Sequence, residues 1–160
     1  VAVEAASPNN VSLLKGRMKF QTIGPDKLNQ LRHARMFPNF EVLKKHMKKH
    51  AKILRPKFEA VINELNKQLA GKEIAEWTNP LGGYFVNLNV RKGCAKRVEE
   101  LCAQAGLKLT SVGATYPYGK DPEDKNIRIA PTFPSRDELC KAVEILCLCV
   151  EIAAIEKILG

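Results

Sequence analysis

The stretch GGYFVNLNV, residues 82–90, follows a two-residue repeat. One side of it would carry Phe85, Asn87 and Asn89, and the other Tyr84, Val86, Leu88 and Val90. Successive side chains of a strand point to opposite faces, so this alternation predicts a strand with one face buried. Turn-forming residues before it, Asn79 to Gly83, join it to EIAEW, residues 73–77. We therefore expect the two segments to pair as antiparallel strands.

The segments that follow alternate between helix and strand patterns. A helical repeat over residues 94–105 ends at Gly106, because glycine readily adopts the left-handed conformation that closes a helix. LKLTSV, residues 107–112, is predicted to be a strand, and a polar loop rich in glycine and proline follows over 113–125. NIRIAP, residues 126–131, is the last predicted strand.

A long helix is expected at the C-terminal end. Ser135 as the N-cap and Glu138 three residues later form the capping-box pattern. The apolar side of this helix consists of Leu139, Val143, Leu146, Val150, Ala153 and Ile158. A helix with such a stripe buries it against another layer. The sequence therefore predicts an α+β fold, a small antiparallel sheet with helices packed on one face.

A long connecting helix is predicted ahead of the sheet. Residues 38–69 place apolar side chains at steps of three or four, and Gly71 stops the pattern. The stripe comprises Phe40, Leu43, Met47, Ala51, Leu54, Phe58, Val61, Leu65 and Leu69. Proline has no backbone N–H to donate, so we expect a kink near Pro56.

The first 37 residues indicate a separate unit. VAVEA, residues 1–5, has the pattern of a strand that is apolar on both faces, and such strands belong to larger, mostly parallel sheets. Ser7 and Pro8 then begin a helix, as N-cap and first helical residue. We expect residues 1–37 to be the tail of a larger domain and residues 38–160 to be a C-terminal small domain. On this interpretation the chain is the C-terminal piece of a longer protein.

Composition excludes several classes of protein. With 160 residues and 45% hydrophobic side chains, the chain can bury one sizeable core. No apolar run approaches the roughly 20 residues of a membrane-spanning helix, and no signal-peptide pattern opens the chain. We therefore expect a cytoplasmic protein without a membrane partner. The five cysteines show no CxxC spacing, which predicts reduced, buried thiols.

The net charge of +9 raises the question of nucleic acid. Most of the excess lies in KKHMKKHAKILRPK, residues 44–57, on the side of the long helix opposite its apolar stripe. No aromatic residues are interleaved as in a nucleic-acid site, so the pattern favours a solvated basic face and no nucleic-acid partner. His46 and His50 are four residues apart but have no third ligand nearby, and no metal site is predicted.

The order of the motifs resembles one enzyme family. The motifs are QTIGPDKLNQLRH (21–33), WTNPLGGYFVNL (77–88), AGLKLTSVGATYPYG (105–119) and NIRIAPTFPS (126–135). Together they resemble the C-terminal part of aminotransferases of the aspartate aminotransferase fold family, and in particular a bacterial class I/II subgroup related to MocR-type regulators. The resemblance implies pyridoxal 5'-phosphate as the cofactor, amino-acid and 2-keto-acid substrates, and a homodimer.

Arg128 is the main candidate site residue. It lies between two isoleucines on the last predicted strand, and a buried guanidinium is costly unless an anion meets it. The resemblance implies that Arg128 binds the α-carboxylate of the substrate, which its planar set of donors suits. The alternative is an ion pair with Asp121, Glu123 or Asp124. Spacing alone does not decide between the two, and the resemblance favours the substrate.

The resemblance implies further site residues. Thr22 matches a loop that reaches the cofactor phosphate of the other subunit in the family's dimers. Gly83 matches a place where the chain runs close to the substrate, and Tyr116, with Tyr118, would form a wall of the substrate pocket. Simpler alternatives remain open, namely a local turn bond for Thr22 and an ordinary turn at Gly83.

The catalytic lysine of the family has no match in this chain. In relatives it forms the Schiff base with the cofactor and precedes the segment that matches VAVEA. We therefore expect no catalytic residue among the 160 and no covalent cofactor binding by this chain alone. The favoured function is the C-terminal domain of a pyridoxal-phosphate-dependent aminotransferase. The alternatives are a stand-alone anion-binding module, or a pyridoxal-phosphate-dependent lyase or regulator on the same scaffold.

Overall fold

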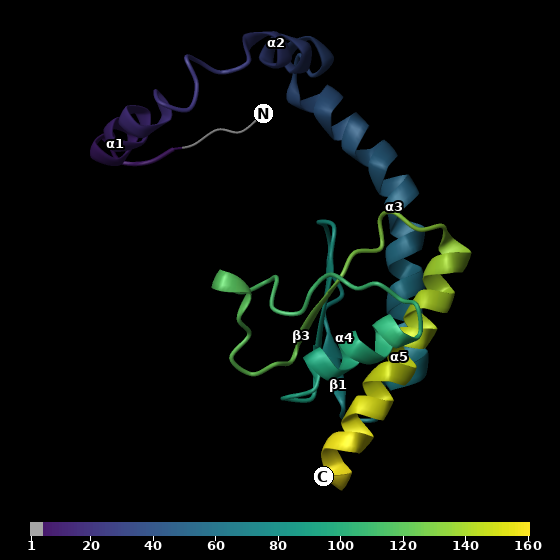
Figure 1. Ribbon diagram of the computed structural model, residues 1–160. Coiled ribbons are helices and arrows are strands. Elements are labelled where there is room, and N and C mark those ends of the chain that lie inside the picture. The colour runs from purple at the N-terminus through teal and green to yellow at the C-terminus, as the bar shows by residue number, and fades with distance from the viewer. Residues whose placement is uncertain (1–4) are drawn as a thin grey trace. The chain divides into compact units, whose positions relative to one another are not determined.

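The computed structural model describes residues 5–160 (Figure 1). The chain divides into two units at the boundary between His50 and Ala51, and each is described by itself. Apart from Ala5, the strand predicted over residues 1–5 lies outside the described residues.

The first unit begins with two capped helices. In α1 (Pro8–Met18) the hydroxyl of Ser7 accepts the backbone N–H of Asn10 at 3.4 Å, which confirms Ser7 as the predicted N-cap. In α2 (Lys27–Met36) the carboxylate of Asp26 accepts a backbone N–H at 2.9 Å. Neither helix contains a buried residue, so local capping bonds define where the two helices begin.

The predicted long helix is α3 (Phe40–Leu69), which continues through Pro56. It begins slightly later than predicted because the side chain of Asn39 accepts the backbone N–H of Val42 at 3.1 Å and so acts as the N-cap. Gly71 follows its end with a φ of +77°, as predicted for a helix-stopping glycine. Its buried residues all lie in the second half, namely Ala60, Val61, Leu65 and Leu69.

The sheet of the second unit is antiparallel with strand order β1-β2-β3. Its strands are β1 (Ala75–Trp77), β2 (Val86–Val90) and β3 (Asn126–Ile129). The pairing of the first two confirms the hairpin predicted from the alternation. The pairing of β2 with β3 sets Asn87 opposite Arg128. Residues directly opposite each other share a face, so this register decides which side chains meet Arg128.

One face of the sheet is buried under helices, which confirms the predicted α+β fold (Figure 1). The helices are the second half of α3, α4 (Ala95–Gln104) and α5 (Arg136–Leu159). The strands contribute Val86, Leu88, Val90, Ile127 and Ile129 to the core. The predicted capping box of α5 is present, with Ser135 and Glu138 each accepting a backbone N–H of the other. Burial of this one face leaves the opposite face of the sheet polar.

The strand predicted over residues 107–112 is wrong, because these residues form no strand and pair with none. Leu107 and Leu109 do pack against the core, which accounts for the apolar residues that suggested a strand. The backbone N–H of Val112, however, donates to the carboxylate of Glu99 at 3.4 Å, where a strand would donate to its neighbour. Apolar side chains here pack on the core from an irregular segment, without the pairing of a strand.

Candidate functional site

The polar face of the sheet carries the candidate site. The register of the strands places on it Glu76, Asn87, Asn89, Asn126 and Arg128. Phe85 directly precedes β2 and shares the face because it lies two residues before Asn87. Sequence alternation thus sends apolar side chains to the core and aligns amide, carboxylate and guanidinium groups on the opposite face.

Arg128 occupies the middle of β3 and is half-buried. Its Nε atom is buried and has no hydrogen-bond partner among residues 5–160. In the part of the chain that the structure describes, no carboxylate lies within ion-pairing distance of its guanidinium. A buried donor without a partner is costly, and a guanidinium satisfies that need best with an anion.

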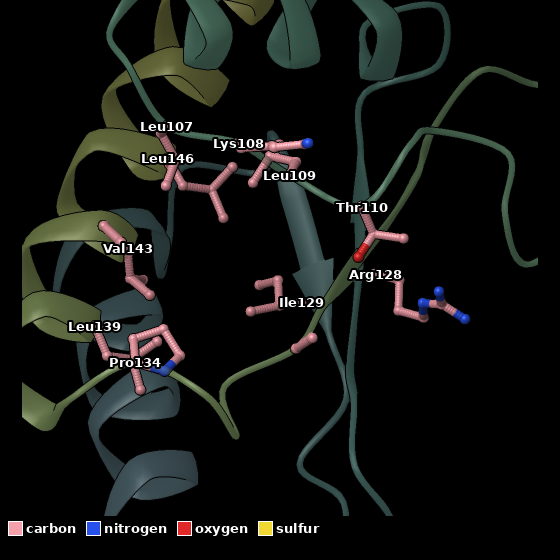
Figure 2. Close-up of a pocket in the computed structure, with 12 residues that line it drawn as sticks. Leu107, Lys108, Leu109, Thr110, Arg128, Ile129, Pro134, Leu139, Val143 and Leu146 are labelled. Carbon is pink, nitrogen blue, oxygen red and sulfur yellow. The ribbon is translucent and has the colours of Figure 1, made fainter.

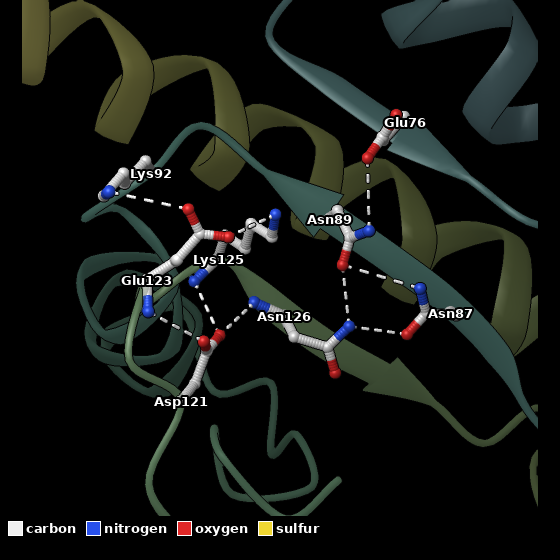
Figure 3. Close-up of polar contacts among 8 residues, drawn as sticks. All are labelled: Glu76, Asn87, Asn89, Lys92, Asp121, Glu123, Lys125 and Asn126. Atoms are coloured by element: carbon white, nitrogen blue, oxygen red, sulfur yellow. Dashed lines mark hydrogen bonds and ion pairs between the residues drawn. The ribbon is translucent and has the colours of Figure 1, made fainter. Parts of the chain in front are cut away.

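The three acids proposed as alternative partners bind other groups, and Figure 3 shows the contacts of two of them, Asp121 and Glu123. Asp121 accepts backbone N–H groups of the turn that leads into β3, at 2.8 to 3.0 Å. Glu123 forms ion pairs with Lys125 at 2.6 Å and Lys92 at 3.5 Å. The Lys125 ammonium is the main cause that holds the pKa of Glu123 below its usual value. Asp124 accepts a backbone N–H at the start of α4, at 3.1 Å.

The Arg128 side chain leaves the sheet on the side away from α5 (Figure 2). On the α5 side, an apolar cavity of about 120 Å³ is lined by Leu109, Leu139 and Val143 among others. On the polar side, the Cζ atom of Arg128 lies 4.4 Å from the centroid of the Phe85 ring. The guanidinium therefore has an aromatic ring as a neighbour, in place of an acid.

A network of three asparagines lies on the same face as Arg128, since Asn87 is directly opposite it. Figure 3 shows the hydrogen bonds of this network. The amide nitrogen of Asn126 donates to the side-chain oxygens of Asn87 at 2.5 Å and Asn89 at 2.7 Å. Asn126 is only 6% exposed, and the hydroxyl of Thr115 donates to its oxygen at 2.6 Å. Sequence reasoning missed this network, although the asparagines at every second position of the predicted strand were a signal for it.

Tyr116 lies beside this network and Tyr118 does not. A hollow of about 390 Å³ is lined by Asn87, Asn89, Thr115, Tyr116, Lys125 and Asn126. Tyr118 is 97% exposed, with a φ of +59°. Gly83 has a φ of +93°, and a Cβ added to it would meet no atom within 4 Å. The left-handed backbone requires glycine there, and open space surrounds it.

Thr22 belongs to the first unit and forms a local turn. Its hydroxyl donates to the carbonyl of Gly24 at 2.7 Å and accepts the backbone N–H of Gly24 at 3.2 Å. This is the local turn bond that the sequence left open. Both residues are exposed.

Other candidate groups take no part in this face. The Nε2 atoms of His46 and His50 lie 3.0 Å apart, but residues 5–160 contain no group of three metal-ligating side chains. All five cysteines are free, and only Cys140 is not fully buried. Burial raises the pKa of the Cys147 thiol to about 12.

Among the described residues, no helix has the length and apolar character needed to span a membrane.

Comparisons with known proteins agree on one family. The family described as aspartate amino-transferase matches residues 1–160. A Mycolicibacterium smegmatis protein named as an aminotransferase is 44% identical over all 160 residues, which make up 37% of its length. A solved aspartate transaminase of Corynebacterium glutamicum is 44% identical, with a TM-score of 0.86 over 95% of this chain and 36% of its own.

A more distant structure shows the same fold. The kynurenine aminotransferase of Pyrococcus horikoshii, solved in complex with PMP, is 18% identical with a TM-score of 0.76, and the match covers 91% of this chain and 35% of that one. The chain thus spans a little over a third of the length of the relatives that it matches. With every residue matched and 44% identity, the chain belongs to the aspartate aminotransferase family.

Proposed function

We propose that the chain is the C-terminal part of a longer pyridoxal-phosphate-dependent aminotransferase. Residues 1–37 would be the tail of the large cofactor-binding domain, and residues 38–160 the small domain. The chain matches only 36 to 37% of the relatives' length, which supports its being part of a longer enzyme. The unit boundary at His50 falls within α3, which would be the helix connecting the two domains.

The proposed reaction is transfer of an amino group between an amino acid and a 2-keto acid. Arg128 would bind the α-carboxylate that both substrates share. The observation that carries this proposal is the half-buried guanidinium with a buried Nε and no carboxylate partner among residues 5–160. A carboxylate accepts two parallel N–H bonds from one guanidinium, and a strand holds that geometry better than a loop does.

Gly83 and Tyr116 would complete the substrate side of the site. Gly83 keeps the chain free of a side chain two residues before the ring that contacts Arg128. Tyr116 lines the polar hollow next to the asparagine network. We propose that Gly83 leaves room for the substrate and that Tyr116 forms one wall of its pocket.

Pyridoxal 5'-phosphate is the proposed cofactor. When bound, it supplies the carbonyl carbon that takes up the amino group and the ring that withdraws electrons from the substrate. Thr22 is exposed just before α2, and a hydroxyl with nearby backbone N–H groups suits one contact to the phosphate of the partner subunit's cofactor. The lysine that attaches to the cofactor would lie outside this chain.

The assembly would be a cytoplasmic homodimer that contains the complete domains. The Pyrococcus enzyme in complex with PMP supports the cofactor, since PMP is the aminated form of pyridoxal phosphate. The narrower placement beside MocR-type regulators rests on the motifs around Thr22, Gly83 and Arg128 and stays a proposal.

The test of this function is Arg128→Lys in the full-length enzyme. Lysine keeps the charge but loses the bidentate geometry, so the substrate complex is expected to weaken by about 2–4 kcal/mol, with cofactor binding unchanged. The measurements are single-turnover rates against substrate concentration, together with the melting temperature. A lower melting temperature with an unaltered rate and affinity would remove Arg128 from the active site and leave it a structural residue.

A further inference from the structure

The ring of Phe85 contacts the Arg128 guanidinium. The Cζ atom lies 4.4 Å from the ring centroid, within the range of a cation–π contact. Phe85 precedes β2, and its alternation neighbour Asn87 is the residue directly opposite Arg128. The ring thus reaches the guanidinium as a diagonal cross-strand neighbour.

Arg128 needs a group that fixes its orientation. Its side chain has several rotatable bonds, and ordering such a chain costs up to about 2 kcal/mol in conformational entropy. In many sites an acid does this by accepting two guanidinium N–H groups. No carboxylate among residues 5–160 does so for Arg128, and its Nε donates to no atom of those residues.

An aromatic ring orients a guanidinium without using its donors. The ring contacts the flat π-face of the cation, while the N–H groups point outward in the plane. A carboxylate from the protein would instead occupy the edge of the guanidinium that carries these N–H groups. It would also neutralise the positive charge. With a ring as partner, the edge stays available for a ligand carboxylate.

We propose that Phe85 is a positioning residue that holds the Arg128 guanidinium in the plane required for bidentate binding of the substrate α-carboxylate. This inference rests on the proposed role of Arg128. The ring is 45% exposed and is not among the residues of the hydrophobic core, and it contacts the Arg128 cation. Loss of the ring should therefore affect carboxylate binding more than folding.

The experiment uses the full-length holoenzyme, three variants at the neighbouring positions 84 and 85, and Arg128→Lys. Phe85→Leu keeps an apolar side chain but removes the π-face, and Phe85→Tyr keeps the ring. Tyr84→Leu is the matched control, because it removes an exposed aromatic residue next in the chain that has no such contact with Arg128. Melting temperatures show whether each variant is folded.

The probes separate the α-carboxylate from the rest of the substrate. Propionate, an unreactive carboxylate, is titrated by calorimetry. L-Aspartate is compared in single turnovers with β-alanine, which keeps the distal carboxylate of aspartate and lacks the α-carboxylate. Phe85→Leu is expected to weaken propionate binding and raise the KM for L-aspartate about 3- to 30-fold, the range of one cation–π contact, with β-alanine unaffected. Phe85→Tyr is expected to stay near the wild-type values.

The outcomes distinguish this inference from the function on which it rests. An Arg128→Lys arm with unchanged propionate affinity would overturn the carboxylate role of Arg128 itself. If Arg128→Lys weakens propionate binding and Phe85→Leu does not, only the positioning role of Phe85 is overturned. Equal losses for L-aspartate and β-alanine, or an equal effect of Tyr84→Leu, would assign Phe85 a merely structural role.

Discussion

Asp121 stabilises the turn that carries the chain into β3. Its carboxylate accepts the backbone N–H groups of Glu123, Lys125 and Asn126. Burial by itself would raise the pKa of this carboxyl, but the backbone N–H groups together lower the pKa below the ordinary 3.8. A depressed folded-state pKa means that the stabilisation is complete above the ordinary value and is lost as the pH falls through the lower folded-state value.

We predict that Asp121→Asn lowers the free energy of unfolding by about 1–3 kcal/mol near pH 7, because a charged acceptor of three backbone bonds is replaced by a neutral one. The difference from the wild type should shrink as the pH falls below the ordinary carboxyl pKa, where the unfolded chain takes up the proton, and should be lost once the pH passes the lower folded-state pKa. Urea unfolding between pH 2 and 7 measures this, with Asp137→Asn in the exposed first turn of α5 as the control. A difference that does not change with pH would contradict the role of the charge.

The sequence predicts on which element a residue lies better than it predicts which side chains that residue contacts. Arg128 could be placed on a strand because the isoleucines on both sides of it predict burial of alternate positions. Its contact with Phe85 could not be predicted, since it depends on the register between two strands about 40 residues apart. The same holds for the bonds between Asn126 and Asn87, which only the pairing of β2 with β3 brings together.

In the loop that carries Tyr116, Gly113 lies against the backbone of Gly119. Gly113 has a φ of +86°, and a Cβ added to it would collide with the backbone carbonyl of Gly119. The carbonyl of Gly113 also accepts the backbone N–H of Tyr116 at 2.9 Å. The position of Tyr116 therefore depends on a site where no other residue fits.

We predict that Gly113→Ala is more destabilising than Gly106→Ala. Gly106 has a similar φ of +80° but open space around it, so alanine there adds only the left-handed backbone strain of about 1–2 kcal/mol. At Gly113 the collision adds to that strain and must displace the loop. Thermal unfolding of both variants measures the difference. Equal melting temperatures would show that the loop shifts at little cost and that Gly113 does not fix Tyr116.

Helix ends followed from the sequence more reliably than the irregular segments did. The caps at Ser7 and Ser135 depend on residues within one helical turn, so local sequence is sufficient to identify them. Residues 107–112 alternate like a strand but obtain their hydrogen bonds elsewhere, from Glu99 in one case. Whether an alternating segment pairs is decided by long-range contacts that the sequence pattern does not contain.

In the proposed function, this chain would supply one side of the active site. The described residues provide the arginine, its aromatic neighbour and the polar hollow, all in the second unit. None of them is expected to attach the cofactor, because the resemblance implies that the family's lysine precedes the segment matching VAVEA. Some lysines bind groups within the fold. Lys57 donates to the backbone carbonyl of Thr132 at 2.8 Å, and Lys125 forms an ion pair with Glu123.

We predict that the isolated chain of residues 1–160 does not attach pyridoxal phosphate at any single lysine and shows no transaminase activity. An amine becomes an efficient site of attachment when burial or a nearby cation lowers its pKa, whereas the Glu123 carboxylate raises the pKa of Lys125. Borohydride reduction after incubation with the cofactor, followed by mass mapping, should show only scattered, substoichiometric labels. The full-length enzyme, treated in parallel, should carry one label per subunit outside these residues. A stoichiometric label on one lysine of the isolated chain would place the attachment site here and refute the proposed division of the active site.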